Sequence, residues 1–305
     1  MPPLVNSPVD RETLRGDTRS CLLCGAPLRP WFAKASRHFS RCPACGLVVV
    51  PEGVATNEVG VSIYEATDNV FAADGNDGYY MDHESNLANC RLKLDWVRRD
   101  LAPGARLLDA GSNFGHFLKV AEEHYDATGF DLSPAAVAWA REQYGVRSRV
   151  ASVYDAAFPK GSFDGVTFWD VLEHLADPLA ALEQLRRLLR PGGRLFLSTP
   201  DVGSLTARLM GRRWHYLDPV QHITVFSRDN LRRALERAGF SVVRMGALGH
   251  RYRVRYVFDR LRYLHPQGPV GAAVSLGRLL GRPFGNRSIY LQLGDVVVAT
   301  AVRAA

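Results

Sequence analysis

Residues 105–200 alternate short apolar runs with segments in which apolar residues recur at helical spacing. The apolar runs predict strands over residues 106–109, 127–131, 149–153, 163–169 and 194–198. The periodic segments predict helices over residues 114–124, 134–144 and 178–189, and proline begins the last two. Such alternation predicts a Rossmann-like α/β fold with a doubly wound parallel sheet, which binds its ligands at the carboxyl ends of the strands.

The turn after the first of these strands reads "LLDAGSNFGHF". It lacks the Lys-Ser/Thr pair of a Walker phosphate loop, and Gly111 and Gly115 are too few for a dinucleotide fingerprint. Asp109 precedes the first glycine, where a carboxylate repels a pyrophosphate but suits an ammonium group. Asp131 closes the second strand 22 residues later, where an acid can accept hydrogen bonds from ribose hydroxyls. An amino group and a ribose without phosphate together indicate S-adenosylmethionine.

Four of the five cysteines form two C-x-x-C pairs, each followed by glycine: Cys21 with Cys24, and Cys42 with Cys45. With 17 residues between the pairs, this spacing predicts a tetrahedral zinc site. Two disulfides are the alternative, but reducing cytoplasm would keep the thiols free. Four thiolates leave no open position for a water, so the zinc is expected to be structural. Cys90 is expected to be an ordinary thiol.

The length of 305 residues suits one large domain with a small companion. We expect a zinc-binding ribbon over residues 18–50, a linker or lid with a leading helix over 51–100, and the main domain over 101–305. The net charge is +7, but 34 of the 38 basic residues are arginine, a skew that base composition alone can produce. Neither a secretory signal nor an apolar run of about 20 residues is present, which predicts a cytoplasmic protein.

The motifs of the main domain carry a family resemblance. "LLDAGSNFGHFL", "ATGFDLSP", "FPKGSFDGVTFWDVLEHLADP" and "LRPGGRLFLSTP" resemble the successive motifs of class I S-adenosylmethionine-dependent methyltransferases, over about residues 106–240. The resemblance implies a seven-stranded sheet whose final two strands are "FSVVRMGAL" and the antiparallel "LQLGDVVVATAVR". The four-Cys ribbon and "GRRWHYLDPVQHITVFSRDNLRRALERAGF" resemble a subgroup that acts on sugars, glycan ends and natural products.

The resemblance assigns cofactor-binding roles residue by residue. Asp109, Gly111 and Gly115 match the first motif, and Asp131 matches the acid that binds the ribose. Asn113 stands where the family usually has a middle glycine, and asparagine tolerates left-handed geometry better than most residues.

The remaining cofactor contacts follow from position alone. The family often places an aspartate near the end of the third strand for the adenine amine, but Ser152 stands there. We therefore expect the backbone of Ser152 and Val153 to contact the adenine. Leu132, beside the ribose acid, and Asp170, at the end of the fourth strand, complete the expected cofactor site.

Two histidines are candidates for the base that accepts a proton from the methyl acceptor: His174 in "DVLEHL" and His222 in "DPVQHITVF". Asp170, Glu173 and His174 also resemble the D/E-x-x-E-H cluster of ubiquinone-pathway O-methyltransferases, which can hold a divalent metal. The alternative is that these three residues form a capping and packing cluster.

Two functions and an inactive form stay open. The first function is O-methylation of a sugar, glycan or natural-product small molecule. The second is methylation of rRNA or tRNA, with the ribbon binding the nucleic acid. The inactive form would be a binding protein with the methyltransferase fold. The ribbon offers basic and aromatic side chains for that purpose: Arg29, Lys34, Arg37, Arg41, Trp31, Phe32 and Phe39. No Asn-Pro-Pro-Tyr-type motif of base methylation follows the fourth strand, where "WDVLEH" stands.

Three segments lie outside these motifs. The polar stretch over residues 54–85 is expected to be a loop that can fold over a site, and residues 86–100 are expected to form the leading helix. Residues 251–265 combine five arginines with apolar residues at near-helical spacing. This segment is either an interfacial helix that reaches a lipid-linked or anionic acceptor at a membrane, or a helix with arginine stems along the core.

Overall fold

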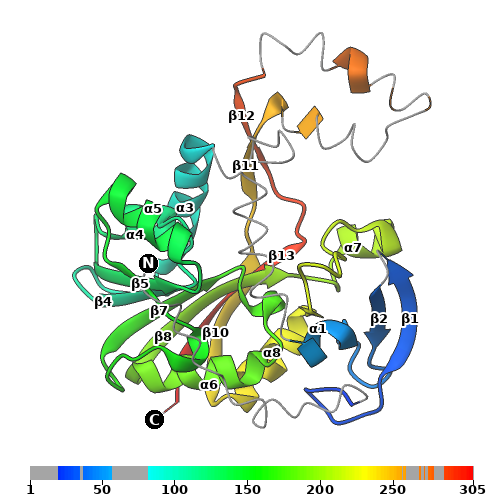
Figure 1. The fold of residues 1–305 in the computed structure, drawn as a ribbon, viewed down its shortest axis with the longest axis horizontal. Coiled ribbons are helices and arrows are strands. Elements are labelled where there is room, and N and C mark those ends of the chain that lie inside the picture. The colour runs from blue at the N-terminus through cyan, green and yellow to red at the C-terminus, as the bar shows by residue number, and fades with distance from the viewer. Residues whose placement is uncertain are drawn as a thin grey trace, which may run out of the picture.

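The computed structural model describes residues 20–34, 37–56, 82–255, 257–258, 268, 271, 274–277 and 285–304. The largest element is a seven-stranded sheet (Figure 1). From edge to edge its strands are β10 (Phe240–Ala247), β13 (Val296–Arg303), β8 (Leu189–Pro200), β7 (Phe163–Trp169), β4 (Arg106–Ala110), β5 (Asp126–Asp131) and β6 (Ser148–Val150). The strands from β8 to β6 are parallel, and β13 runs antiparallel between β8 and β10.

Helices cover both faces of this sheet (Figure 1). On one face lie α3 (His83–Val97), α4 (His116–Ala121) and α5 (Pro134–Tyr144), and on the other lie α6 (Pro178–Leu188) and α8 (Arg228–Arg237). Successive side chains of a strand point to opposite faces, and Leu107 and Leu108 accordingly join different clusters of buried residues. The predicted fold class, an α/β Rossmann-like sheet of seven strands, is confirmed.

Local signals set the helix boundaries. The Ser133 side chain accepts a hydrogen bond from the backbone of Ala136 at the start of α5, and Gly145 ends that helix in a left-handed conformation. The expected bounds of 134–144 are therefore confirmed. Helix α4 is shorter than the predicted 114–124, because the left-handed Gly115 delays its start. The strand expected over 149–153 ends at Val150, and a 3₁₀ turn follows over Val153–Asp155.

The cysteine ribbon shares a sheet with the main domain. Its strands β1 (Arg29–Lys34), β2 (Arg37–Arg41) and β3 (Val48–Val49) are completed by β9 (Thr224–Val225), which lies just before α8 in the chain. The short helices α1 (Pro51–Thr56) and α7 (Leu205–Met210) lie nearby (Figure 1). The Asn230 side chain of α8 also donates a hydrogen bond to the Cys45 carbonyl at 2.9 Å. The ribbon is therefore built into the main domain, because residues of both belong to the same clusters of buried side chains.

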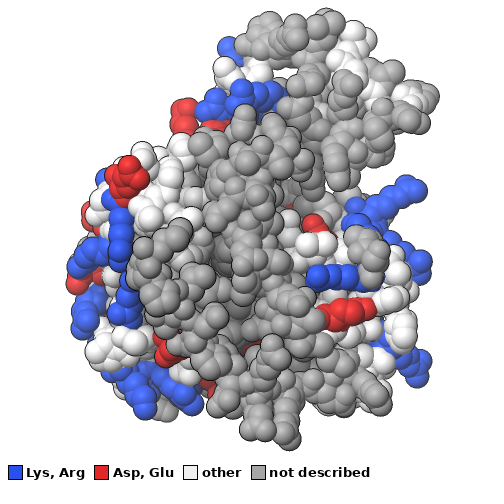
Figure 2. Space-filling model, in the orientation of Figure 1, with Lys and Arg blue, Asp and Glu red and all other residues white. Residues whose placement is uncertain are grey.

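Basic side chains lie around the margin of the face drawn in Figure 2, both over the ribbon side and over the side of α3–α5. Among the described residues, no helix is long and apolar enough to cross a membrane.

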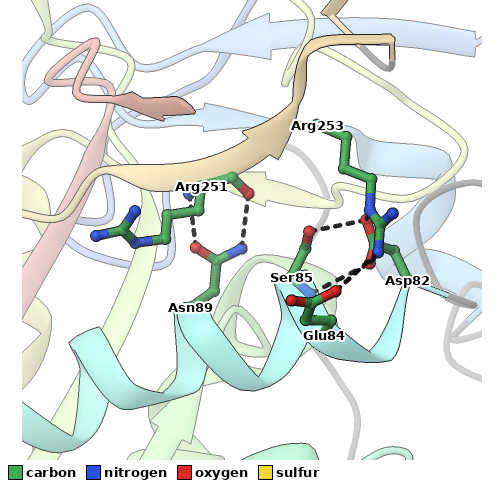
Figure 3. A network of polar contacts seen from close by, with 6 residues as sticks. All are labelled: Asp82, Glu84, Ser85, Asn89, Arg251 and Arg253. Carbon is green, nitrogen blue, oxygen red and sulfur yellow. Dashed lines mark hydrogen bonds and ion pairs between the residues drawn. The ribbon is translucent and has the colours of Figure 1, made fainter. Parts of the chain in front are cut away.

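A two-stranded arm, formed by β11 (His250–Arg253) and β12 (Ser288–Leu291), packs against the leading helix α3 through β11 (Figures 1 and 3). The Asn89 side chain accepts a hydrogen bond from the Arg251 amide at 2.6 Å and donates one to its carbonyl at 3.1 Å. Arg253 forms an ion pair with Asp82, the cap of α3. The helix predicted over residues 251–265 is therefore wrong for residues 251–253, which form β11. Residues 254–255 and 257–258 are helical, and residues 256 and 259–265 lie outside the described part. The loop predicted over 54–85 falls largely outside it as well, since residues 57–81 are not described.

Candidate active site

The glycine turn after β4 adopts the left-handed geometry that its sequence requires. Gly111, Asn113 and Gly115 have φ angles of 75°, 45° and 70°. A side chain at Gly111 would meet Val171 at 2.6 Å, and one at Gly115 would meet Ala140 at 2.8 Å. Glycine is therefore required at both positions, whereas asparagine tolerates the left-handed region between them.

The turn is tied to Asp131 at the end of β5. The Asp131 carboxylate accepts hydrogen bonds from the backbone N–H groups of Asn113 at 2.7 Å and Ser133 at 2.9 Å. Only 1% of the residue is exposed. Burial raises the pKa of Asp131, although these backbone donors act in the opposite direction. The sequence-predicted partners at the ends of β4 and β5 are therefore brought together by direct bonds.

Asp109, at the end of β4, is a second buried carboxyl group in this half of the site. It is 2% exposed and accepts a hydrogen bond from the Thr167 hydroxyl at 2.6 Å. Burial raises its pKa to about 7, and the negative charge of Asp131 adds to the effect. A cation placed beside Asp109 would favour its ionised form, so this pair of acids suits a positively charged ligand.

The expected adenine contacts lie at the end of the neighbouring strand. Ser152 precedes the 3₁₀ turn, and its hydroxyl accepts a hydrogen bond from the Tyr154 amide at 3.2 Å. Val153 is buried, and Leu132 leaves 41% of its surface exposed beside Asp131. An exposed apolar side chain at this edge provides a surface on which a flat ring can pack.

Asp170 follows β7 and has a φ of 55°, which is strained for a residue other than glycine. Its carboxylate accepts hydrogen bonds from the Lys93 ammonium at 2.8 Å and the Ser198 hydroxyl at 2.7 Å. Burial alone would raise the pKa of Asp170, but the charges of Lys93 and His250, together with the hydrogen bonds from Lys93 and Ser198, outweigh it and lower the pKa to about 2. Asp170 is thus ionised, and both of its carboxylate oxygens already accept hydrogen bonds from other residues of the protein. It is therefore poorly placed to hold a metal.

Glu173, His174 and His222 form a compact cluster beside this pair, with their ligand atoms within 4.8 Å of one another. Glu173 is 1% exposed and accepts a hydrogen bond from the Thr199 hydroxyl at 2.9 Å. Burial and the negative charge of Asp170 raise the pKa of Glu173 to about 8. The sequence pattern had grouped Asp170 with Glu173 and His174 as possible metal ligands. In the structure, the third member of this cluster is His222.

Both histidines direct Nδ1 at a backbone carbonyl. The distance is 2.7 Å from His174 to the Gln221 oxygen and 2.7 Å from His222 to the Tyr216 oxygen. A carbonyl oxygen only accepts, so each Nδ1 carries the proton, and each Nε2 of a neutral ring keeps its lone pair. Burial lowers the pKa of both rings, and in His222 the nearby His174 helps to lower it to about 3. Near neutral pH both rings are therefore uncharged and can accept a proton or bind a metal.

The four ribbon cysteines also gather at one point, with all four sulfur atoms within 4.8 Å of one another. The sulfur–sulfur distance is 3.5 Å both from Cys21 to Cys45 and from Cys24 to Cys42, and all four thiols are free. Four sulfurs about 2.3 Å from a tetrahedral zinc ion lie roughly 3.8 Å apart, so the set fits zinc closely. Burial raises the pKa of Cys90 to about 12, as for an inert thiol.

Residues 81–245, more than half of the chain, match the family described as "Methyltransferase domain". The chain belongs to this methyltransferase domain family. The resemblance read from the sequence motifs is thereby confirmed.

Two groups of known proteins are similar to this methyltransferase-family chain. Ubiquinone biosynthesis O-methyltransferases from Xanthomonas oryzae and Xanthomonas campestris are 46% and 44% identical over 118 and 116 residues. Each match covers 35% of this chain and 48% of the relative, so the chain spans about half the length of these relatives. Among solved structures, a SAM-dependent methyltransferase from Thermotoga maritima superposes with a TM-score of 0.52 at 17% identity, over 79% of this chain and 99% of that one. The [4+2]-cyclase SpnF superposes with a TM-score of 0.50 at 20% identity, over 83% and 95%. These structures share the fold of the methyltransferase domain.

Lys93 is the site residue that sequence reasoning missed. It lies on α3, far from every motif of the methyltransferase domain, yet 14% of its side chain is exposed and it pairs with Asp170. The available signal was its spacing, because it stands three residues after Cys90 and four before Val97, on the apolar face of the helix. A lone lysine on such a face indicates an acidic partner on a neighbouring element.

Proposed function

We propose that this protein is an S-adenosylmethionine-dependent methyltransferase that transfers a methyl group to a hydroxyl group of a small molecule. The observation that carries the proposal is the contrast at one edge of the sheet. Buried acids with raised pKa values stand beside a glycine turn. Two uncharged histidines with available Nε2 atoms lie together beside them in the site, His174 shortly after β7 and His222 just before β9.

The first half would hold the cofactor. Asp109 would receive the amino group of S-adenosylmethionine, Asp131 its ribose hydroxyls, and Leu132 with the backbone of Ser152 and Val153 its adenine. When bound, the cofactor supplies a methyl group on a sulfonium, which a nucleophile takes in an in-line displacement. The protein's task is then to align the acceptor and manage its proton.

The second half would manage that proton. His174 or His222 accepts the proton of the acceptor hydroxyl at Nε2, and the carbonyl bonded to Nδ1 orients the ring and stabilises the positive charge. A second candidate is a divalent cation on Glu173, His174 and His222, which would lower the pKa of the hydroxyl. Carboxylate and imidazole ligands suit zinc and similar ions, but the metal would first have to displace the proton from Glu173.

The relatives support the choice of oxygen as the acceptor atom. The Xanthomonas proteins are named O-methyltransferases, and their similarity is substantial over more than 110 residues. We propose a sugar, glycan or natural product as the acceptor class, because the four-Cys ribbon resembles that of methyltransferases acting on such molecules.

The ribbon's contacts argue for a small molecule over RNA. Phe39 is fully buried, so it cannot stack on a base. The Lys34 ammonium donates a hydrogen bond to the Leu217 carbonyl at 2.7 Å, and Arg37 donates to the Pro219 carbonyl at 3.2 Å. Two of the four basic side chains expected to meet phosphates are therefore bonded within the protein.

Methyl transfer can be tested with labelled S-adenosylmethionine and fractionated extract of the source cells. We expect label to enter a small molecule with the wild-type protein and at least about a hundredfold more slowly with His174→Ala or His222→Ala. His124→Ala, on the far side of α4, is the matched control. Label in RNA would favour the nucleic-acid alternative, and no label in any fraction would favour an inactive binding protein.

A further inference from the structure

A cavity of about 560 Å³ lies between the ribbon and the methyltransferase domain. The ribbon contributes Trp31 and Arg41, and the domain contributes Arg208 of α7, Asp201 and Arg228. Its volume falls within the range of small-molecule sites, which is roughly 300–1,000 Å³. Segments separated by more than 150 residues in the chain therefore enclose one ligand-sized space.

The charges around this cavity favour an anion. Asp201 is 3% exposed, and its carboxylate is bonded to Arg228 at 3.3 Å and to the Gly203 amide at 2.8 Å, so its charge is balanced. Asp229 is the second acid in the wall. Arg41 and Arg208 also line the wall, and neither forms an ion pair with any residue in the described part of the chain.

Arg41 is oriented by an aromatic neighbour. Its guanidinium carbon lies 5.5 Å from the centre of the Trp31 ring, within the range of a cation–π contact. A guanidinium held in this way loses little freedom when it binds phosphate or carboxylate oxygens. Trp31 and Arg41 together thus offer a flat apolar surface next to fixed N–H donors.

Two segments connect the cavity wall with the proposed proton-accepting cluster. Thr199, which donates a hydrogen bond to Glu173, and Asp201, in the cavity wall, stand two residues apart on the same face of the chain leaving β8. Leu217 lines the cavity, and the preceding carbonyl, of Tyr216, accepts the hydrogen bond from His222. One segment therefore forms a wall of the cavity and positions the histidine.

We propose that this cavity binds an oxyanion group of the methyl acceptor, a phosphate or a carboxylate, and that the ribbon serves as one wall of the acceptor site. The proposal rests on the proposed methyltransferase function, because it names the class of acceptor for that site. Arg41 and Arg208 bind the oxyanion through charge-assisted hydrogen bonds. A zinc ion held by the four ribbon cysteines would then act at a distance, because it would fix the position of the strand that carries Arg41.

Calorimetric titration of the full-length protein with inorganic pyrophosphate, and separately with benzoate, tests the proposal at low salt. We expect at least one probe to bind the wild-type protein with a Kd below about 1 mM, and the double variant Arg41→Gln/Arg208→Gln to weaken it at least about tenfold. Pyrophosphate binding alone would assign a phosphate group, and benzoate binding alone a carboxylate. Arg187→Gln, exposed on α6 and not among the residues that line the cavity, is the matched control and should change neither titration.

Two results would overturn the proposal: no binding of either probe, or equal binding by the double variant and the wild type. The exposed Arg208→Gln alone decides the matter if the double variant unfolds. S-adenosylhomocysteine is titrated into the same samples. If S-adenosylhomocysteine binds and neither anion binds, only the cavity proposal is wrong. If an anion binds and S-adenosylhomocysteine does not, only the methyltransferase proposal is wrong.

Discussion

The two halves of the site, at the carboxyl ends of the parallel strands, differ in how their charges are balanced. At the ends of β4 and β5, two buried acids face hydroxyl and backbone donors, and burial raises the pKa of both. At the ends of β7 and β8, the acid Asp170 is paired with Lys93, and the histidines are uncharged. The first half gains from a cationic ligand, whereas the second is already balanced and suits a neutral reacting group, such as a hydroxyl.

This difference matches the two reactants of methyl transfer from a sulfonium. The cofactor carries positive charge at its amino group and its sulfur, and an acceptor hydroxyl is neutral until it loses its proton. If the comparison is right, variants of one half should change cofactor affinity and variants of the other should change turnover.

The largest effect is expected from the histidines. His174→Ala or His222→Ala should lower kcat by roughly 10²–10⁴-fold if that ring accepts the proton. The affinity for S-adenosylhomocysteine should stay near that of the wild type, because the cofactor contacts lie in the other half. Burial lowers the pKa of both rings, so the base form should persist well below pH 6.5, the ordinary histidine value. Steady-state rates between pH 5 and 8 check this, and a wild-type rate that falls below pH 6.5 with both variants fully active would contradict it.

A smaller effect is expected for Asp131→Ala, in the cofactor half. It should weaken S-adenosylhomocysteine binding by about 1.5–3 kcal/mol, which is the usual loss for hydrogen bonds to a charged group. Asp126→Ala, at the exposed opposite end of the same strand, is the matched control. Calorimetry that finds equal affinities for the two variants would break the assignment of this half.

Loss of zinc should also affect the two halves of the site differently. The wild-type protein should carry about one zinc ion per chain, and Cys42→Ser should reduce this content. Because β3 pairs with β9, which follows His222 closely, turnover should fall by roughly tenfold, an estimate for a misplaced general base, while cofactor affinity stays near normal. Cys90→Ser is the control. Metal analysis that shows no zinc in freshly reduced wild-type protein would rule out the zinc site.

The smallest effect concerns the stability of the acceptor half. Because the folded-state pKa of Glu173 is raised to about 8, its favourable contribution is present below the unfolded value, about 4.3, and is lost as the pH rises toward 8. Glu173→Gln should therefore gain thermal stability relative to the wild type between pH 5 and pH 8, by about a few degrees in Tm. Scanning calorimetry at both pH values measures this, and a gain that shrinks with rising pH would contradict the raised pKa.

The sequence predicted what adjacent residues determine. Pro134 and the helical spacing after it predicted α5, because helix starts depend on local backbone geometry. The left-handed turn at Asn113 was predicted for the same reason, and the order of motifs led to the topology of the sheet.

The rest depends on contacts between distant segments. His222 meets Glu173 because the backbone N–H of the next residue, Ile223, donates a hydrogen bond to the Glu173 carbonyl. Lys93 meets Asp170 because α3 packs on one face of the sheet. Likewise, Arg251 lies in a strand because Asn89 bonds to its backbone, although its own neighbours have helical spacing. No local pattern encodes these pairings.

Titration of the wild-type protein with S-adenosylhomocysteine tests the central claim most directly, with NAD as the comparison ligand. The account predicts saturable binding at one site per chain, competition by S-adenosylmethionine, and no measurable binding of NAD. Tight binding of NAD without binding of S-adenosylhomocysteine would contradict it.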